Sequence, residues 1–134
     1  MQRINIAPYP SPRPRFTKHG RTYMPKAYTD WKYGFLKLWR LHGGRKFEKH
    51  VPIKVNLAFY IAPPKAIESV KKHQTCLEKE TIPVPKKPDA DNFIKSVLDA
   101  LNGYAWQDDG QITDITAVKR YSKNPRVEIE IFPV

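Results

Sequence analysis

A nine-residue stretch in which apolar and polar side chains alternate constrains the fold of this chain most strongly. Every second residue from Ile53 to Ile61 is apolar, which predicts a β-strand with one buried face. The residues from Arg126 to Phe132 alternate in the same way and predict another strand. Strands of this kind need a covering layer, because the apolar face of a sheet must pack against another element.

Weaker alternation predicts two more strands, over residues 3–7 and 111–121. The turn-forming sequence Lys123-Asn124-Pro125 separates the second of these from the terminal strand. We therefore expect the last two strands to pair with each other as a hairpin.

Apolar residues at helical spacing predict the covering layer. Thr29 or Asp30 is expected to cap a helix that runs to about Leu41 and stops before Gly43-Gly44. Its expected buried stripe consists of Trp31, Phe35, Leu38 and Leu41 or His42. At this spacing Trp31 and Trp39 are better explained as core residues than as platforms for base stacking.

A second helix is expected to begin with an N-cap near Asp91-Asn92 and to end before Gly103. Its apolar stripe is Phe93, Ile94, Val97, Leu98 and Leu101. Residues 65–79 have few apolar side chains and predict a short exposed helix. Together these elements predict one α+β domain over residues 1–134, with a small mixed sheet of about four strands and two or three helices.

The acidic residues of this basic chain are concentrated in one region. Of 13 acids, six fall within residues 89–114: Asp89, Asp91, Asp99, Asp108, Asp109 and Asp114. Neighbouring carboxylates repel one another unless a cation lies between them. This concentration favours a site for Mg²⁺ or Mn²⁺ held against a polyanion.

The spacing of these acids supports such a site. Asp91, Lys95 and Asp99 lie at i, i+4 and i+8, on one face of the predicted helix. Asp89 is expected to point the same way as Asp91, and the Asp108-Asp109-Gly110 turn is able to fold back toward them. Lys95 is suited to hold a phosphate, because a charged lysine cannot be a metal ligand.

Each feature also has a purely structural interpretation. Asp91 is a plausible N-cap, Asp91, Lys95 and Asp99 are spaced as an ion-pair ladder, and Asp108-Asp109-Gly110 is an ordinary turn sequence. Any one of these is commoner than a metal ligand. Their occurrence together, in a chain with few other acids, favours the metal site.

The rest of the chain is strongly basic, with a net charge of +11 and a pI near 9.8. Residues 1–50 hold 12 Lys and Arg against two acids, which predicts a polyanionic partner. The four prolines of residues 8–15 exclude helix and interior strand, so we expect an extended basic arm, or equally a solvated loop. The candidate DNA-binding residues are Arg13, Arg15, Lys18, Arg21, Lys86 and Lys87.

Composition also argues against several other classes of protein. No apolar run approaches the roughly 18 residues of a spanning helix, so a membrane partner is not expected. The single cysteine, Cys76, excludes an internal disulfide and fits a reducing cytoplasm. The four histidines lack the spacing of zinc ligands.

The acidic region resembles the RusA family of Holliday junction resolvases. Three family patterns recur in order: K-P-D-x-D-N-L-x-K from Lys87 to Lys95, D-A-L-N-G from Asp99 to Gly103, and W-x-D-D-x-Q-I from Trp106 to Ile112. The one departure is Phe93 where leucine is usual, an apolar exchange. The match is dense over residues 86–112 and looser elsewhere.

The resemblance implies a homodimeric, Mg²⁺-dependent endodeoxyribonuclease that also accepts Mn²⁺. Such enzymes resolve four-way DNA junctions by paired symmetric nicks that leave 5′-phosphate and 3′-hydroxyl ends. The family's essential carboxylates fall on Asp89, Asp91 and Asp109 and its essential lysine on Lys95, while Asp99 and Asp108 are further candidate ligands. A bacterial cytoplasm, with phage or prophage origin, is the expected setting.

Two alternatives remain at this point. One is a non-catalytic, basic DNA-binding protein of architectural type, in which the acids are caps and ion pairs. The other is a metal nuclease that acts on other branched DNA or on RNA–DNA hybrids.

Overall fold

The strand expected over residues 53–61 lies at the interior of a mixed sheet. A computed structural model describes the backbone of residues 1–134 and every side chain except that of Arg15. In the described chain the sheet has four strands in the order β1-β6-β4-β5. Their bounds are β1 Gln2–Ile4, β4 Ile53–Ile61, β5 Ile112–Tyr121 and β6 Arg126–Pro133. β4 is parallel to β5 and antiparallel to β6, so the predicted α+β class with a mixed sheet is confirmed.

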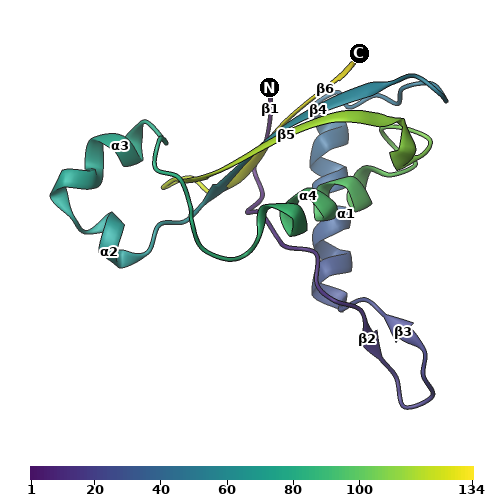
Figure 1. Cartoon of the computed structure of the whole chain (residues 1–134), viewed down its shortest axis with the longest axis horizontal. Coiled ribbons are helices and arrows are strands. Elements are labelled where there is room, and N and C mark those ends of the chain that lie inside the picture. The colour runs from purple at the N-terminus through teal and green to yellow at the C-terminus, as the bar shows by residue number, and fades with distance from the viewer.

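The predicted hairpin of the last two strands is wrong. β5 and β6 follow each other in the chain, but β4 lies between them and pairs with both (Figure 1). The link of residues 122–125 is long enough to span the roughly 10 Å between alternate strands of a sheet. β4 is the most apolar strand, and the interior position pairs its backbone on both sides and buries Val55, Leu57 and Phe59.

Two helices, α1 (Lys26–Leu41) and α4 (Ala90–Leu101), contribute most of the side chains that pack on the sheet. Phe35 from α1, Phe93 and Val97 from α4, and Phe59 from β4 are at most 2% exposed and belong to one core cluster. The rings of Phe59 and Phe93 stack with centroids 5.2 Å apart. Each such side chain contributes about 1.5–3 kcal/mol when fully buried, so this core fixes how α4 lies on the sheet.

Helix α1 begins three residues earlier than the predicted cap at Thr29, with Pro25 at the N-cap position. Proline is favourable at a helix start because the first N–H groups have no intrahelical acceptor. Trp39 is a core residue, as expected, whereas Leu41 is 74% exposed. At 100° per residue, Leu41 is turned about 200° away from Trp39, which places it on the solvent side.

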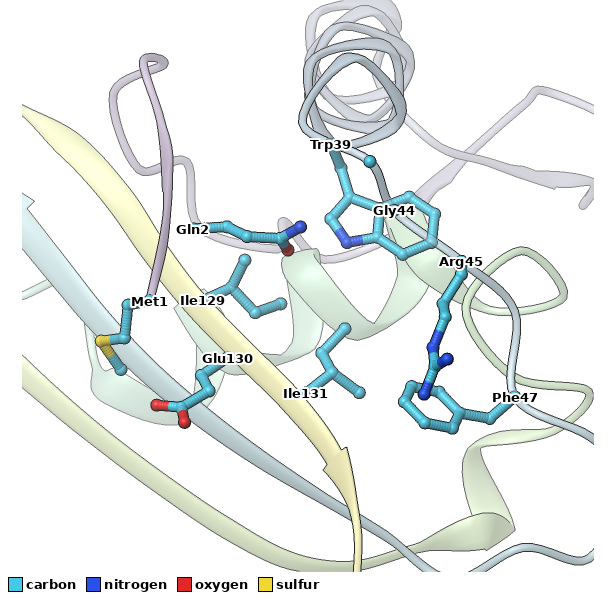
Figure 2. A pocket seen from close by; sticks show the side chains of 10 residues that line it. Met1, Gln2, Trp39, Gly44, Arg45, Phe47, Ile129, Glu130 and Ile131 are labelled. Carbon is cyan, nitrogen blue, oxygen red and sulfur yellow. The ribbon is translucent and has the colours of Figure 1, made fainter.

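The C-terminal end of α1 packs against β6 beside a cavity of about 460 Å³ (Figure 2). Gly44 lies on the indole ring of Trp39, so close that a Cβ atom at this position would fall 2.4–2.7 Å from ring carbons. Ile129 and Ile131 of β6 also line this cavity. A glycine is therefore required where the chain leaves α1.

Helix α4 starts at Ala90, so Asp89 and not Asp91 is its N-cap residue. The Asp89 carbonyl accepts from the amides of Asn92 and Phe93, which sets the first turn earlier than predicted. The C-terminal end agrees with expectation, since Gly103 adopts a φ of +83° just beyond the helix.

The predicted exposed helix over residues 65–79 is divided into three short segments: α2 Lys65–Glu68, the 3₁₀ helix η1 Lys71–His73, and α3 Gln74–Glu78. Figure 1 shows them extending from one end of the sheet. A small second core of Leu77, Val84 and Tyr121 supports them. None of the described helices combines the length and apolar character needed to cross a membrane.

The proline-rich stretch 8–14 has no helix or strand, as predicted. It leads into a small hairpin that the sequence did not predict, formed by β2 (Arg15–Phe16) and β3 (Thr22–Tyr23). In Figure 1 this hairpin projects from the body beyond the start of α1. Two-residue strands give little alternation to detect, which explains the omission.

Candidate active site

Asp89, Asp91 and Lys95 occupy the first two turns of α4 and are all exposed. Asp89 has an extended backbone (φ −68°, ψ 147°) at the N-cap, and its side chain makes no capping hydrogen bond. Among the described side chains, none of the three residues belongs to an ion pair. The two structural interpretations, an ion-pair ladder and an N-cap at Asp91, therefore do not apply, and all three side chains face solvent.

The segment before Asp89 is held by a residue that sequence reasoning missed. Lys119 of β5 points toward α4, and its Nζ donates to the carbonyl of Lys86 at 2.7 Å and to that of Pro88 at 2.8 Å. The sequence carried no signal for it, because the register that places Lys119 opposite Phe59 depends on the pairing of β5 with β4, which was not predicted. Lys119 thus fixes the backbone that leads into the acidic helix.

Asp109 lies in the 3₁₀ helix η2 (Asp109–Gln111) at the other end of α4. The indole N–H of Trp106, which is fully buried, donates to Asp109 Oδ1 at 2.7 Å. Burial raises the pKa of the Asp109 carboxyl, the Trp106 hydrogen bond opposes that rise, and the nearby charges of Asp99 and Asp108 add to it. One oxygen of Asp109 is oriented by Trp106, and the other remains available.

Asp108 has a structural role in the same turn. Its Oδ2 accepts from the Gly110 amide at 3.1 Å, while Gln111 Oε1 accepts from the amides of Gln107 (2.8 Å) and Asp108 (3.2 Å). This reciprocal pattern is a capping box, and it engages one oxygen of the Asp108 carboxylate in the turn. Asp109 is the better candidate for a ligand, because it lies near Asp99, another of the site acids.

Asp99 connects the site to α1 and to the proline-rich arm. The buried hydroxyl of Tyr28 donates to Asp99 Oδ2 at 2.8 Å. Burial raises the pKa of the Tyr28 phenol, a hydrogen bond with Ser11 opposes that rise, and Asp99 adds to it. The Ser11 amide in turn donates to the Asn92 carbonyl at 2.9 Å. The arm is therefore anchored beside α4 before it continues to Arg13.

The acids are arranged along α4 rather than gathered at its N-terminus. Eight residues separate Asp91 from Asp99, about 12 Å along a helix axis, and the charges that raise the pKa of Asp109 are those of Asp99 and Asp108. Among the described side chains, no three Asp, Glu, His or Cys residues lie close enough together to hold a metal ion. Convergence of all the acids at one point is not observed.

The chemistry of the donor set still fits a hard divalent cation. Mg²⁺ prefers oxygen ligands and typically takes only one or two carboxylates, with water and substrate phosphate completing its shell. Each end of α4 offers two carboxylates: Asp89 and Asp91 at its start, and Asp99 and Asp109 at the other end.

Basic residues border the site. Five of the six predicted DNA-binding side chains are exposed: Arg13, Lys18, Arg21, Lys86 and Lys87. The sixth, Arg15, has a side chain outside the described part of the structure. Lys86 and Lys87 immediately precede the acidic helix, in the segment that Lys119 holds.

The exposed face of α4 presents carboxylates and a lysine beside a basic arm. This combination of residues on a small α+β domain is typical of a phosphodiester-cleaving nuclease. Comparison with known proteins identifies the group: the family described as "Endodeoxyribonuclease RusA" matches residues 5–132. The chain belongs to the RusA endodeoxyribonuclease family.

Two relatives illustrate the relationship. The chain is 39% identical over 80 residues to the protein YqaN of Bacillus subtilis (strain 168), across 60% of this chain and 56% of that protein. It is 32% identical over 89 residues to the crossover junction endodeoxyribonuclease rusA of Lactococcus phage r1t, across 66% of this chain and 60% of that protein. Both alignments span less than two thirds of the relative's length.

Proposed function

We propose that this protein is a metal-dependent, structure-selective endodeoxyribonuclease that resolves four-way DNA junctions. It makes paired symmetric nicks and leaves 5′-phosphate and 3′-hydroxyl ends. The observation that carries the proposal is the family match over residues 5–132. That match includes the exposed acidic helix and its lysine.

In this proposal Asp89 and Asp91, at the start of α4, and Asp109, beyond its other end, would supply the carboxylate ligands for Mg²⁺ or Mn²⁺, and Asp99 and Asp108 are secondary candidates. When bound, the cation would supply Lewis-acid charge neutralisation at the scissile phosphate. Lys95, exposed one turn after Asp91 on α4, contacts a phosphate oxygen and stabilises negative charge that develops during cleavage. Lys86, Lys87 and the arm from Arg13 hold the flanking backbone.

A homodimer follows from the same proposal. Two symmetric nicks in a four-way junction require two sites related by a two-fold axis, which a closed dimer provides. Branched double-stranded DNA is the proposed substrate, and the basic surface supplies affinity for it.

The first experiment compares a labelled synthetic four-way junction with a linear duplex of matching sequence. Each is incubated with the protein in Mg²⁺ or in EDTA. Paired nicks on the junction alone, lost in EDTA, are the expected result. Tight junction binding with no nicking under any divalent cation would contradict the proposal and favour an architectural protein. Equal cutting of flaps or forks would indicate a different branched substrate.

A substitution tests the site itself. Asp91→Asn removes one carboxylate charge and should abolish cleavage while leaving junction binding intact. Asp114→Asn is the matched control, because Asp114 is an exposed acid of β5 outside the proposed site. If Asp91→Asn cuts at the parental rate, the assignment of the site is wrong.

A further inference from the structure

A groove follows the exposed side of α1 and meets the candidate active site only at Asp99. One part is a cavity of about 160 Å³ between α1 and the end of α4, lined by Lys32, Tyr33, Asp99 and Tyr104 among others. The next part, of about 470 Å³, is lined by Tyr33, Leu36, Lys37, Arg40 and Leu41. Tyr33 and Leu36 line both parts, so the groove is continuous along the helix. We call it the α1 groove.

Helix geometry explains why these side chains are outside the core. Tyr33, Lys37 and Arg40 recur at i, i+4 and i+7 and lie opposite the buried stripe of α1. Tyr33 is 67% exposed and Leu41 is 74% exposed, so apolar surface is present without a covering element. Apolar surface that is exposed and bordered by charged side chains is typical of a binding site.

Two of the cations are held in place by aromatic rings. Lys32 Nζ lies 4.8 Å from the ring centre of Tyr28, and the Arg40 guanidinium lies 4.7 Å from that of Tyr104. Cation–π contacts of this kind restrict long side chains, which lowers the entropy lost when they bind a ligand. The groove therefore presents ordered positive charge.

We propose that the α1 groove binds the phosphate backbone of one duplex arm of the substrate, through Lys32, Lys37 and Arg40. This inference rests on the proposed function, in that the substrate is DNA. From Lys32 to Arg40 the helix rises about 12 Å. Because one strand rises about 3.4 Å per nucleotide, this length covers roughly three or four nucleotides.

Charge decides between DNA and a second copy of the chain as the occupant. Three cations, Lys32, Lys37 and Arg40, line the groove against one acid, Asp99. Asp30 is the one acid of α1 itself. A symmetric contact between two copies would bring Lys37 and Arg40 against the same residues of the partner, which is repulsive. A polyanion is attracted to the same surface.

The position of the groove supports the same occupant. Asp99 lines its inner end, and Asp99 belongs to α4, the helix that also carries Asp91 and Lys95. The α1 groove therefore ends beside the helix of the candidate active site.

The test is the salt dependence of junction binding, measured by fluorescence anisotropy in EDTA so that no cleavage occurs. For the double variant Lys37→Gln/Arg40→Gln we expect the slope of log K against log salt to fall in magnitude by about 1.8, since each phosphate contact contributes about 0.9. The matched control is Lys71→Gln/Lys72→Gln, two exposed lysines of η1. The control should leave the slope unchanged.

Three outcomes separate the possibilities. A slope equal to that of the wild type in the Lys37/Arg40 variant overturns the inference, even if the wild type cleaves junctions normally. If the Lys37/Arg40 variant shows the expected slope change but the wild type never cleaves, the inference stands while the proposed function fails. If light scattering shows that the Lys37/Arg40 variant has lost a dimer that the wild type forms, the groove is a subunit interface and the inference is overturned.

Discussion

At the scale of single residues, one hydrogen bond sets the orientation of Asp109, a partly buried candidate ligand. Trp106 donates to Asp109 at 2.7 Å from a fully buried position. The adjacent Asp108 is engaged in its own capping box. The hydrogen bond therefore favours Asp109, the ligand that the family resemblance implies, over Asp108, which was kept as a further candidate.

Substitution Trp106→Phe removes this N–H while keeping an aromatic ring. A hydrogen bond to a charged group contributes about 1.5–3 kcal/mol, so we expect junction cleavage to fall about 10- to 100-fold. Single-turnover rates measure the effect. Trp39→Phe is the matched control, since Trp39 is also buried but does not contact the acids, and it should change thermal stability only. Equal rates in the two variants would contradict the role of Trp106.

Lys119 has a comparable effect on the segment before Asp89. Lys119→Met keeps the aliphatic stem but removes both hydrogen bonds to the carbonyls of Lys86 and Pro88. We expect faster tryptic cleavage after Lys86 and slower junction cleavage. Lys119→Arg, which retains donors, should restore part of both properties. Unchanged proteolysis in Lys119→Met would show that the segment is held by other contacts.

At the scale of elements, the two glycines near α1 show how packing decides what a position tolerates. A Cβ at Gly44 would fall 2.4–2.7 Å from the Trp39 ring, whereas a Cβ at Gly34 would meet only Ile6 Cδ1 at 3.5 Å. Figure 2 shows Gly44 against Trp39. The first position has no room, and the second does.

We therefore expect opposite effects from the same substitution. Gly44→Ala should destabilise the fold by about 1–3 kcal/mol, the usual cost of overpacking. Gly34→Ala lies within α1 and should stabilise it by up to about 1 kcal/mol, because alanine is the better helix former. Urea denaturation of both variants measures the difference. A stability loss of equal size in both would contradict this account.

The elements also show what a sequence can predict. The bounds of β4 agree with expectation because its alternation is uninterrupted from Ile53 to Ile61. The helix starts were misplaced because Pro25 and Asp89 act as caps through backbone geometry, without a side-chain capping bond. The β5–β6 hairpin was wrong because a turn sequence specifies chain reversal and not which strand becomes the neighbour.

The candidate site was predictable to a similar degree. Asp89, Asp91 and Lys95 are exposed on one helix, as their spacing indicated. The hydrogen bond from Trp106 to Asp109 links residues three apart, but it forms because the indole is buried in the core. The hydrogen bonds from Lys119 join β5 to a segment more than 30 residues away. Neither contact follows from the spacing of residue types, so the sequence pattern did not predict them.

At the scale of the whole molecule, one ion-pair network connects the segment of short helices over residues 65–80 to the sheet. Arg126 of β6 makes a bidentate pair with Glu80, with N–O distances of 2.6 and 2.8 Å, and also contacts Glu128 at 2.7 Å. The Arg126 side chain is 3% exposed. Glu80 adopts a left-handed φ of +57°, which costs about 1–2 kcal/mol and is offset by this pairing.

The pH dependence of stability should reflect this pair. The hydrogen bonds from Arg126 lower the pKa of Glu80 below its ordinary value of 4.5, against the opposing effect of burial. Because the pKa of Glu80 is lower in the folded state than in the unfolded state, its ionised form stabilises the fold at pH values above the unfolded-state pKa. This stabilisation is lost as the pH falls through the folded-state pKa. Glu80→Gln should cost about 3 kcal/mol at pH 7 and much less near pH 3, as measured by urea denaturation. An equal cost at both pH values would contradict the assignment.

The order of strands has a consequence for how the protein is made. β6, which follows the other strands of the sheet in the sequence, is the hydrogen-bonding neighbour of both β1 and β4. A nascent chain that lacks β6 keeps β1 unpaired and leaves Val55 and Leu57 beside an open edge. Because contacts this distant in sequence close slowly, the emerging chain carries an exposed β4 until β6 has been synthesised. During that interval, we expect chaperones that recognise extended apolar segments to bind residues 53–61.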